Sequence, residues 1–309
     1  MSASPALSTA HDPPPATEVT RWGVLARAVA AWLAMGVGLG AAGALGEASG
    51  LTGWARQGLT AAICGGFAVT AILVLRRGVD RKSLTGMGLK PPPRGLTGFV
   101  LGLVVTGGCA VAVFGLGAQA GMLDFGAVDG PRLAGFLAMN TVIALALEAV
   151  PEELVFRGYV LTTLNRRLRR WTASILQIGL FSSIMVVVST TQSTVSMALS
   201  DGKFDIAFAP TGMNPVDYLI LMAVFGFALT CARWATGSIL VTMGVHLAFL
   251  TANRLALESH GRGTGWNVAP TPDAALLVPA YLLGVAVVFL VIARVRGGSM
   301  GWRGVNPEL

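Results

Sequence analysis

Long apolar stretches dominate this chain and restrict it to one class of fold. Eight of them lie at about residues 23–46, 54–75, 95–117, 132–164, 172–193, 215–232, 237–256 and 273–293. Each has about the 20 residues, or more, that a helix needs to cross a bilayer. They lack the alternation of apolar and polar residues that marks the strands of a membrane barrel. We therefore predict an all-α, polytopic membrane protein of about eight transmembrane helices, each of which satisfies its own backbone hydrogen bonds.

The composition agrees with a membrane domain. Of the 309 residues, 54% are hydrophobic and only 12% are charged, with a mean hydropathy of +0.69, whereas a soluble domain carries about 25% charged residues. The net charge of +7 does not indicate a nucleic-acid partner, because the basic residues lie at the ends of the apolar stretches. Cys64, Cys109 and Cys231 are odd in number and all lie in apolar runs, so they predict neither a disulfide framework nor a metal site.

Two basic connectors predict the orientation of the chain. Residues 76–94 and the run at 165–170 are the most basic connectors, and loops on the cytoplasmic side are enriched in Lys and Arg. Eight helices that alternate in direction place both connectors and both termini on that same side. The loop expected after the seventh stretch, with Arg254 and Arg262, fits this rule less well.

The chain is therefore expected to consist of one membrane domain with two tails. We predict a disordered cytoplasmic tail at 1–20, an eight-helix membrane domain at 21–296 and a short cytoplasmic tail at 297–309. The expected location is the cell membrane, where the lipid of the bilayer surrounds the helices.

The fourth apolar stretch carries a cluster of charges between residues 148 and 158, EAVPEELVFRG. Each charge at the centre of a bilayer costs on the order of 2.5–3.5 kcal/mol on insertion scales, so the cluster requires partners or a wet cavity. At helical spacing Glu153 and Arg157 share one face, while Glu148 and Glu152 share another about 100° away. Pro151 predicts a kink here, because its ring removes an i→i−4 hydrogen bond.

One histidine, His246, also lies within an apolar stretch, whereas His11 and His260 do not. An imidazole in an apolar helix can act as a base, a ligand or a hydrogen-bond donor, or can simply pack against a neighbouring helix. Asn253 returns to nearly the same helical face two turns later. We expect Glu152 and His246 to face one polar cavity on the cytoplasmic side.

The EELVFRG segment at 152–158 resembles the EExxxR(G) motif of the CPBP family of intramembrane proteases. This family contains CAAX prenyl-protein endopeptidases and bacteriocin-processing proteins of the Abi type. The resemblance extends beyond this motif. Three further segments come in the order of the family: a connector ending in Gly-Leu-Lys-Pro-Pro before the motif, and helices with Phe181 and His246 after it. The resemblance therefore covers about residues 80–255. It implies eight membrane helices around a water-filled cavity open to the cytosol.

The resemblance also implies roles for four residues. The residue matching Glu152 activates a water molecule for peptide hydrolysis, and those matching Glu153 and Arg157 orient neighbouring groups. The residue matching His246 stabilises the developing oxyanion. The implied substrate is a peptide or a lipidated protein.

Two positions depart from the family pattern. The second motif of the family is FxxxH, but the matching stretch here ends in Met185, whose thioether neither takes a proton nor ligates a hard cation. The third motif is HxxxN or HxxxD, but Leu250 stands four residues after His246. Asn253 could take that place only from one turn further along the helix.

The same residues disfavour a metal. The best set of ligands is His246 with Glu148 and Glu152, which straddle Pro151, while Glu153 diverges by about 100°. A catalytic zinc ion usually takes three protein ligands, of which two or more are typically His or Cys. The sequence therefore predicts a site without zinc or another cofactor.

Two functions from different classes follow from these residues. The first is an intramembrane endopeptidase that uses Glu152, Glu153, Arg157 and His246. The second is a catalytically weakened relative that serves as a membrane scaffold or binding protein, in which Glu153 and Arg157 form a helix-locking ion pair. A small-molecule transporter is disfavoured, because the sequence shows no inverted repeat.

Overall fold

The structure is a computed structural model that describes residues 20–200, 204–297, 301 and 303–305. Most of the two predicted tails, and His11 with them, lies outside these residues. The described residues contain eight helical segments that are long and apolar enough to cross a membrane: Arg21–Ala48, Gly53–Val79, Arg94–Gln119, Gly130–Asn165, Arg170–Leu199, Pro215–Thr236, Ile239–Ala256 and Pro272–Val295. The predicted all-α, polytopic fold is therefore confirmed.

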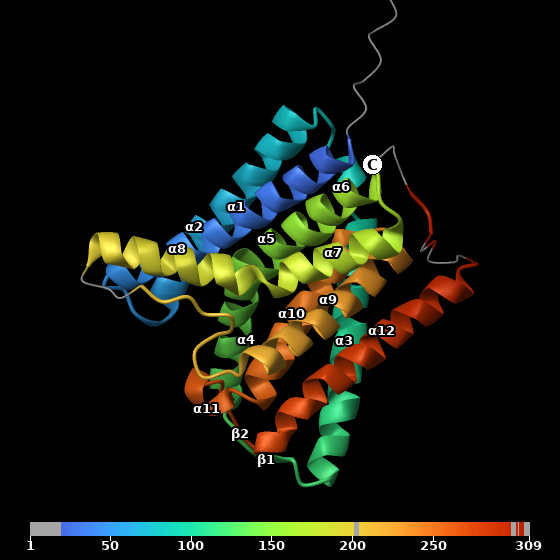
Figure 1. The fold of residues 1–309 in the computed structure, drawn as a ribbon. Helices are drawn as coiled ribbons and strands as arrows, with labels where there is room; N and C mark the ends of the chain where they lie inside the picture. The colour runs from blue at the N-terminus through green and yellow to red at the C-terminus, as the bar shows by residue number, and fades with distance from the viewer. Residues whose placement is uncertain (1–19, 201–203, 298–300, 302, 306–309) are drawn as a thin grey trace, which may run out of the picture.

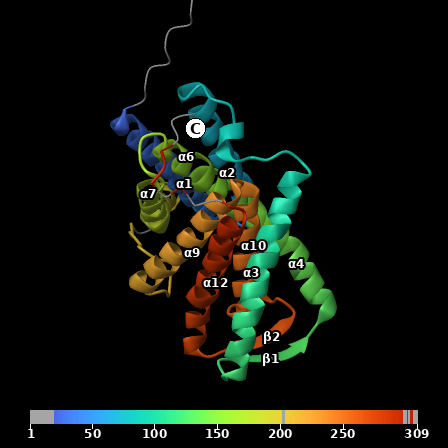
Figure 2. The same ribbon diagram turned by 90° about the vertical axis from the view of Figure 1, so that its right-hand side faces the viewer.

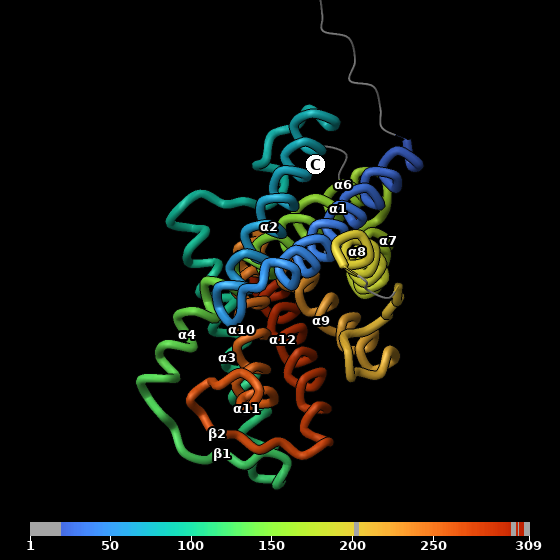
Figure 3. Tube along the Cα trace, turned by 90° about the vertical axis from the view of Figure 1, so that its left-hand side faces the viewer, coloured from blue at the N-terminus to red at the C-terminus, as the bar shows by residue number. Residues whose placement is uncertain are grey.

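Several of these segments are divided by changes in helix type or by a break. The elements in chain order are α1 (Arg21–Ala48), α2 (Gly53–Leu73), η1 (Val74–Val79), η2 (Thr85–Met87), α3 (Arg94–Gln119), β1 (Leu123–Val128), α4 (Gly130–Ala144), η3 (Leu145–Ala149), α5 (Val150–Glu152), η4 (Glu153–Val160), α6 (Leu161–Asn165), α7 (Arg170–Ser182), α8 (Ile184–Leu199), α9 (Pro215–Thr236), α10 (Ile239–Ala256), α11 (Ser259–Arg262), β2 (Trp266–Pro270), η5 (Pro272–Leu276) and α12 (Leu277–Val295). The fifth segment breaks at Ser183, between α7 and α8. Figures 1 and 3 show α8 lying along α1.

The two ends of the helical bundle differ in charge. One end, here called the basic end, carries the start of α1, the end of α12 and both basic connectors (Figure 1). Its cations include Arg77, Arg81, Lys90, Arg94, Arg167, Arg169 and Arg296. The opposite end carries Glu47, Asp124, Asp129, Asp205, Asp217, Glu258 and Asp273. The rule that cytoplasmic loops are basic predicts the basic end on the cytoplasmic side.

Arg254 corrects one detail of the predicted topology. It lies in the last turn of α10 rather than in the loop that follows the seventh helix. Its guanidinium is largely buried and pairs with Glu148. Only Arg262 of that pair therefore lies in the connection at the opposite end.

A two-stranded antiparallel sheet closes the end opposite the basic end (Figure 2). It joins β1 and β2, and the rings of Phe125 and Trp266 lie 5.2 Å apart across it. The sequence alone does not predict this sheet. The reason is that the two strands are short and far apart in the sequence, so that their pairing depends on the helices that bring them together.

Two glycines allow α3 and α10 to touch through their backbones. A Cβ atom at Gly102 would meet the carbonyl oxygen of Val241, and one at Gly244 would meet the carbonyl oxygen of Phe99. Small residues at such crossings let membrane helices approach closely. This crossing fixes α10, the helix that carries His246.

The substitution Gly244→Ala is expected to lower the thermal stability of the detergent-solubilised protein. The added methyl group meets backbone atoms that no side-chain rotation can move, and such overpacking typically costs about 1–3 kcal/mol. Thermal unfolding measures the effect. Gly108→Ala on α3 is the matched control, because a Cβ there meets nothing within 4 Å. Equal stability of the two variants would show that this crossing is not tightly packed.

Candidate active site

The charged cluster lies where the fourth helix changes type. The N–H of Val150 bonds to the carbonyl of Leu145, and the N–H of Leu161 bonds to that of Phe156. Each bond spans five residues and therefore marks a π turn, which is wider than an α turn. Pro151 lies between the two π stretches, η3 and η4, and has no N–H to donate. The helix changes direction between α4 and α6 (Figure 1), as the kink prediction requires.

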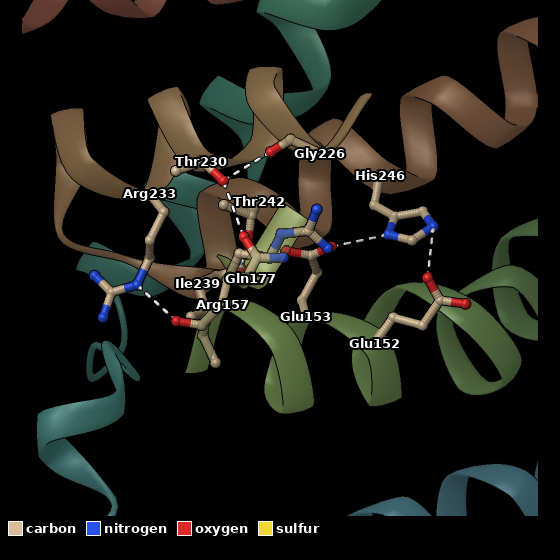
Figure 4. Close-up of polar contacts among 10 residues, drawn as sticks. All are labelled: Glu152, Glu153, Arg157, Gln177, Gly226, Thr230, Arg233, Ile239, Thr242 and His246. Carbon is tan, nitrogen blue, oxygen red and sulfur yellow. Dashed lines mark hydrogen bonds and ion pairs between the residues drawn. The ribbon is translucent and has the colours of Figure 1, made fainter. Parts of the chain in front are cut away.

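Glu152 and Glu153 both reach the same histidine. His246 Nδ1 lies 3.0 Å from Glu153 Oε1, and His246 Nε2 lies 4.0 Å from Glu152 Oε2 (Figure 4). Two adjacent side chains that leave the helix about 100° apart can therefore still meet the two nitrogens of one imidazole.

The two carboxylates differ in their access to solvent. The side chain of Glu153 is 0% exposed, that of His246 is 3% exposed and that of Glu152 is 15% exposed. Glu153 is therefore enclosed by protein, while part of the Glu152 side chain lies at the surface of the described residues. The arrangement combines one fixed and one accessible carboxylate around a single imidazole.

Arg157 completes a buried ion pair with Glu153. Its Nη1 donates to Glu153 Oε1 at 3.1 Å, and both side chains are fully buried. The guanidinium lies 4.1 Å from the centre of the Phe181 ring, a cation–π contact that gains strength when it is desolvated. One oxygen of Glu153 thus accepts from both Arg157 and His246, which fixes the carboxylate between them.

Aromatic rings enclose this polar group. Phe225 stacks on Phe249 at 3.9 Å and meets the His246 ring edge-on at 4.9 Å. Phe181 lies 5.1 Å from Phe156 and 5.9 Å from Phe225. Phe225 lies on α9 and was missed by the sequence analysis, because nothing marks one Phe among many in an apolar helix. The rings exclude water from the buried side of His246.

Two residues considered for supporting roles bond to side chains other than Glu152, Glu153 and His246. Glu148 Oε1 accepts from Arg254 Nη2 at 2.5 Å, and Arg254 Nη1 donates to Asn140 Oδ1 at 2.8 Å. Asn253 Oδ1 accepts from the hydroxyl of Tyr281 at 3.0 Å. Asn253 therefore bonds to α12 and does not replace the residue that the family carries four positions after its histidine.

The sequence predicts a polar cavity at Glu152 and His246. The described residues form three cavities elsewhere. These have volumes of about 660, 610 and 420 Å³, and neither residue lines them. Met185, which stands in place of the family's histidine, lines the smallest of the three together with Ser189 and Asp205. Met185 follows Phe181 across the break at Ser183, and the ring of Phe181 touches that of Phe156.

The described residues contain no group of three or more His, Cys, Asp or Glu side chains placed to hold a metal ion. In the candidate site each nitrogen of the only imidazole already faces a carboxylate oxygen. Few catalytic zinc sites use a single nitrogen ligand. The donor set of this site therefore fits a metal poorly.

One part of this chain matches a known protein family. Residues 134–251 match the Rce1-like family, described as type II CAAX prenyl endopeptidase Rce1-like. The matched segment runs from α4 to α10 and includes Glu152, Glu153, Arg157 and His246. A comparison with curated proteins found no match. The resemblance to CAAX endopeptidases is confirmed over this segment.

Proposed function

We propose that this chain is an intramembrane endopeptidase. It is a multi-pass membrane protein, and its residues 134–251 match the Rce1-like family of type II CAAX prenyl endopeptidases. One observation carries the proposal: a single imidazole lies between two adjacent carboxylates, of which one is sealed and one can be reached. A purely structural ion pair needs Glu153 and Arg157 alone. It gives no reason for an accessible carboxylate opposite His246.

In the proposed reaction Glu152 is the general base. The 4.0 Å between Glu152 Oε2 and His246 Nε2 is too long for a direct hydrogen bond but suits a bridging water molecule. Glu152 takes one proton from this water as the oxygen attacks the carbonyl carbon of the scissile peptide. The proton then passes to the amine as the C–N bond breaks, so that water and one peptide yield a carboxylic acid and an amine.

His246 is the proposed group that stabilises the oxyanion. Its Nδ1 is held by Glu153, which Arg157 holds in turn. When Nε2 carries a proton, it can donate to the oxygen that becomes negative during the attack. Donors fixed in place before the reaction are effective because they need no reorganisation. Glu153 and Arg157 thus act through His246 and do not touch the substrate.

We propose that the reaction needs no metal or other cofactor. The proposal rests on the donor set, which offers one imidazole already engaged by two carboxylates. Since Glu153 already engages Nδ1 of His246, Glu152 is the proposed base that activates the water.

The proposed substrate is a peptide or a lipidated protein that approaches from the basic end. His246 lies seven residues after the start of α10 at that end, a depth of roughly 10 Å at 1.5 Å per residue. An extended segment of a few residues can reach that depth while its lipid anchor stays in the bilayer. We propose that the basic end faces the cytosol and that the protein resides in the cell membrane.

A cleavage assay tests the proposed function. The protein, reconstituted in lipid nanodiscs, is incubated with synthetic peptides that carry a prenylated cysteine near the C-terminus, and with the same peptides without the lipid. Mass spectrometry identifies the products. In parallel, protein termini in membrane fractions of cells with and without the protein are compared. Cleavage that requires the protein supports the proposal. Absence of new termini in both experiments contradicts it.

The substitution Met185→His is expected to raise the cleavage rate by about tenfold or more. It restores the histidine of the family's second motif, and general acid–base assistance is typically worth about 10²–10⁴-fold. The rate is measured with the prenylated peptides. Met197→His is the control, because Met197 lies on the same helix with 50% of its surface exposed. Equal rates for both variants would show that Met185 does not limit activity.

One observation favours a second candidate function. The thioether of Met185 cannot take a proton, so a catalytically weakened protein could retain the fold as a membrane scaffold or binding protein for a lipid, a peptide or a partner helix. In that case Glu153 and Arg157 lock the helix, and Glu152 has no chemical role. A protein that cleaves nothing and gains nothing from Met185→His would support this alternative.

A further inference from the structure

Arg233 is a buried cation that the proposed mechanism does not use. It lies in the last turn of α9 and is only 5% exposed. Among the residues that the structure describes, it forms no ion pair with a carboxylate; its Nε donates to the backbone carbonyl of Arg157 at 3.2 Å (Figure 4). Burying a cation without a carboxylate partner is costly, so its contacts call for an explanation.

The carbonyl of Arg157 needs this donor because of the π turn. In a regular α-helix it would accept from the N–H of Leu161, four residues on. Here the N–H of Leu161 bonds instead to the carbonyl of Phe156. A buried carbonyl without a donor is unfavourable. The Nε–H of Arg233 supplies a donor from another helix and so favours the wide turn over a regular one.

The connector at the basic end also fixes Arg233. Gly88 ends η2 with φ of +87°, and a Cβ at this position would lie 2.6 Å from the central carbon of the Arg233 guanidinium. The carbonyl of Gly88 accepts from the N–H of Ile239 at 3.1 Å, at the start of the helix that carries His246. The backbone of Gly88 therefore lies against Arg233 and the start of α10 together.

We propose that Arg233 is a positioning residue that holds the π turn of η4, so that both Glu152 and Glu153 face His246. Without its hydrogen bond the turn can tighten to a regular α-helix, which rotates and shifts Glu152 and Glu153 relative to the residues that follow them. The inference rests on the proposed function only for its effect on catalysis. The geometry that it predicts can be measured in a protein that cleaves nothing.

The first test measures the imidazole of His246 directly. The chain has three histidines, so the full-length protein labelled with ¹⁵N-histidine gives few ring signals, and His246→Gln assigns those of His246. The substitution Arg233→Met removes the donor while keeping a long side chain. We expect the Nδ1 and Nε2 signals of His246 to shift, because its contacts with Glu153 and Glu152 change.

Arg76→Met is the matched control. Arg76 is also buried, at 2% exposure, and its Nε also donates to a backbone carbonyl, that of Ser83, at 2.9 Å. It lies on η1 rather than beside the site. The control variant should lose stability without moving the His246 signals. Unchanged His246 signals in folded Arg233→Met, or the same shift in both variants, would overturn the proposal.

A second variant acts on Arg233 without removing it. Gly88→Ala places a methyl group against the guanidinium and strains a backbone with positive φ. It should shift the His246 signals in the same direction as Arg233→Met. This variant keeps the test decisive where Arg233→Met does not fold, because the hydrogen-bond donor is still present but displaced.

The cleavage assay then separates positioning from substrate binding. In Arg233→Met we expect kcat to fall by about 10- to 100-fold, since small displacements of reacting groups have effects of this size, while KM stays within about threefold. A rise in KM at constant kcat would overturn the positioning role. If the wild-type protein cleaves nothing but its His246 signals respond as expected, the proposed function fails and the positioning of the imidazole stands.

Discussion

Glu152→Gln is expected to abolish peptide cleavage without changing the fold. The amide has nearly the same shape as the carboxylate but cannot take a proton from water. General base catalysis contributes typically about 10²–10⁴-fold, and the other carboxylate that contacts His246, that of Glu153, is fully buried. Because Glu152 acts on the attacking water, kcat and kcat/KM should fall together. The loss is measured with prenylated peptides under single-turnover conditions.

Glu47→Gln controls for this substitution, because it makes the same chemical change at an exposed position of α1. It should leave cleavage unchanged. Thermal unfolding of Glu152→Gln should match the wild type or exceed it, because a partly buried charge is removed. Cleavage that survives in Glu152→Gln would mean that another group activates the water, and the assignment of Glu152 would be wrong.

Among the single substitutions, Arg157→Met should lower the free energy of unfolding most. It leaves the Glu153 carboxylate fully buried without its cation, and breaking a buried ion pair in this way typically costs about 3–5 kcal/mol. The cation–π contact with Phe181 is lost as well. The loss is measured by thermal unfolding of the solubilised protein.

The double substitution Glu153→Gln with Arg157→Met separates the two candidate functions. Replacing both members of a buried pair by neutral groups is often nearly neutral for stability, so the double variant should regain most of the stability that Arg157→Met loses. It should still cleave poorly, because an uncharged amide at position 153 holds His246 less firmly. Restored stability together with wild-type cleavage would show that the pair only locks the helix.

Local properties of the sequence determined much of this protein. Each helix that crosses the membrane follows from the length of one apolar run, and membrane helices satisfy their backbone groups internally. The pair of Glu153 and Arg157 follows from a spacing of four residues. These features depend on neighbours in the chain, so they can be read without knowing how the helices pack.

Only the tertiary structure decided which partners the polar side chains contact. Arg254 was assigned to a loop, but it lies within α10 and pairs with Glu148. Asn253 was a candidate for the site, but it bonds to Tyr281. Spacing along one helix indicates which residues share a face but not which partner they meet. The partner on the opposing helix is set by how the two helices cross, and one sequence does not encode that crossing locally.

In the candidate site too, the sequence determined some features and the tertiary structure others. The sequence determined which groups are present: two adjacent carboxylates, a proline beside them and one histidine in a distant apolar stretch. The geometry that joins them depends on π turns, and a π turn is stable only where other groups compensate the displaced hydrogen bonds. Here one such group is Arg233 on α9. Since that contact links residues far apart in the sequence, only the folded protein could show that Glu152 and Glu153 face the same imidazole.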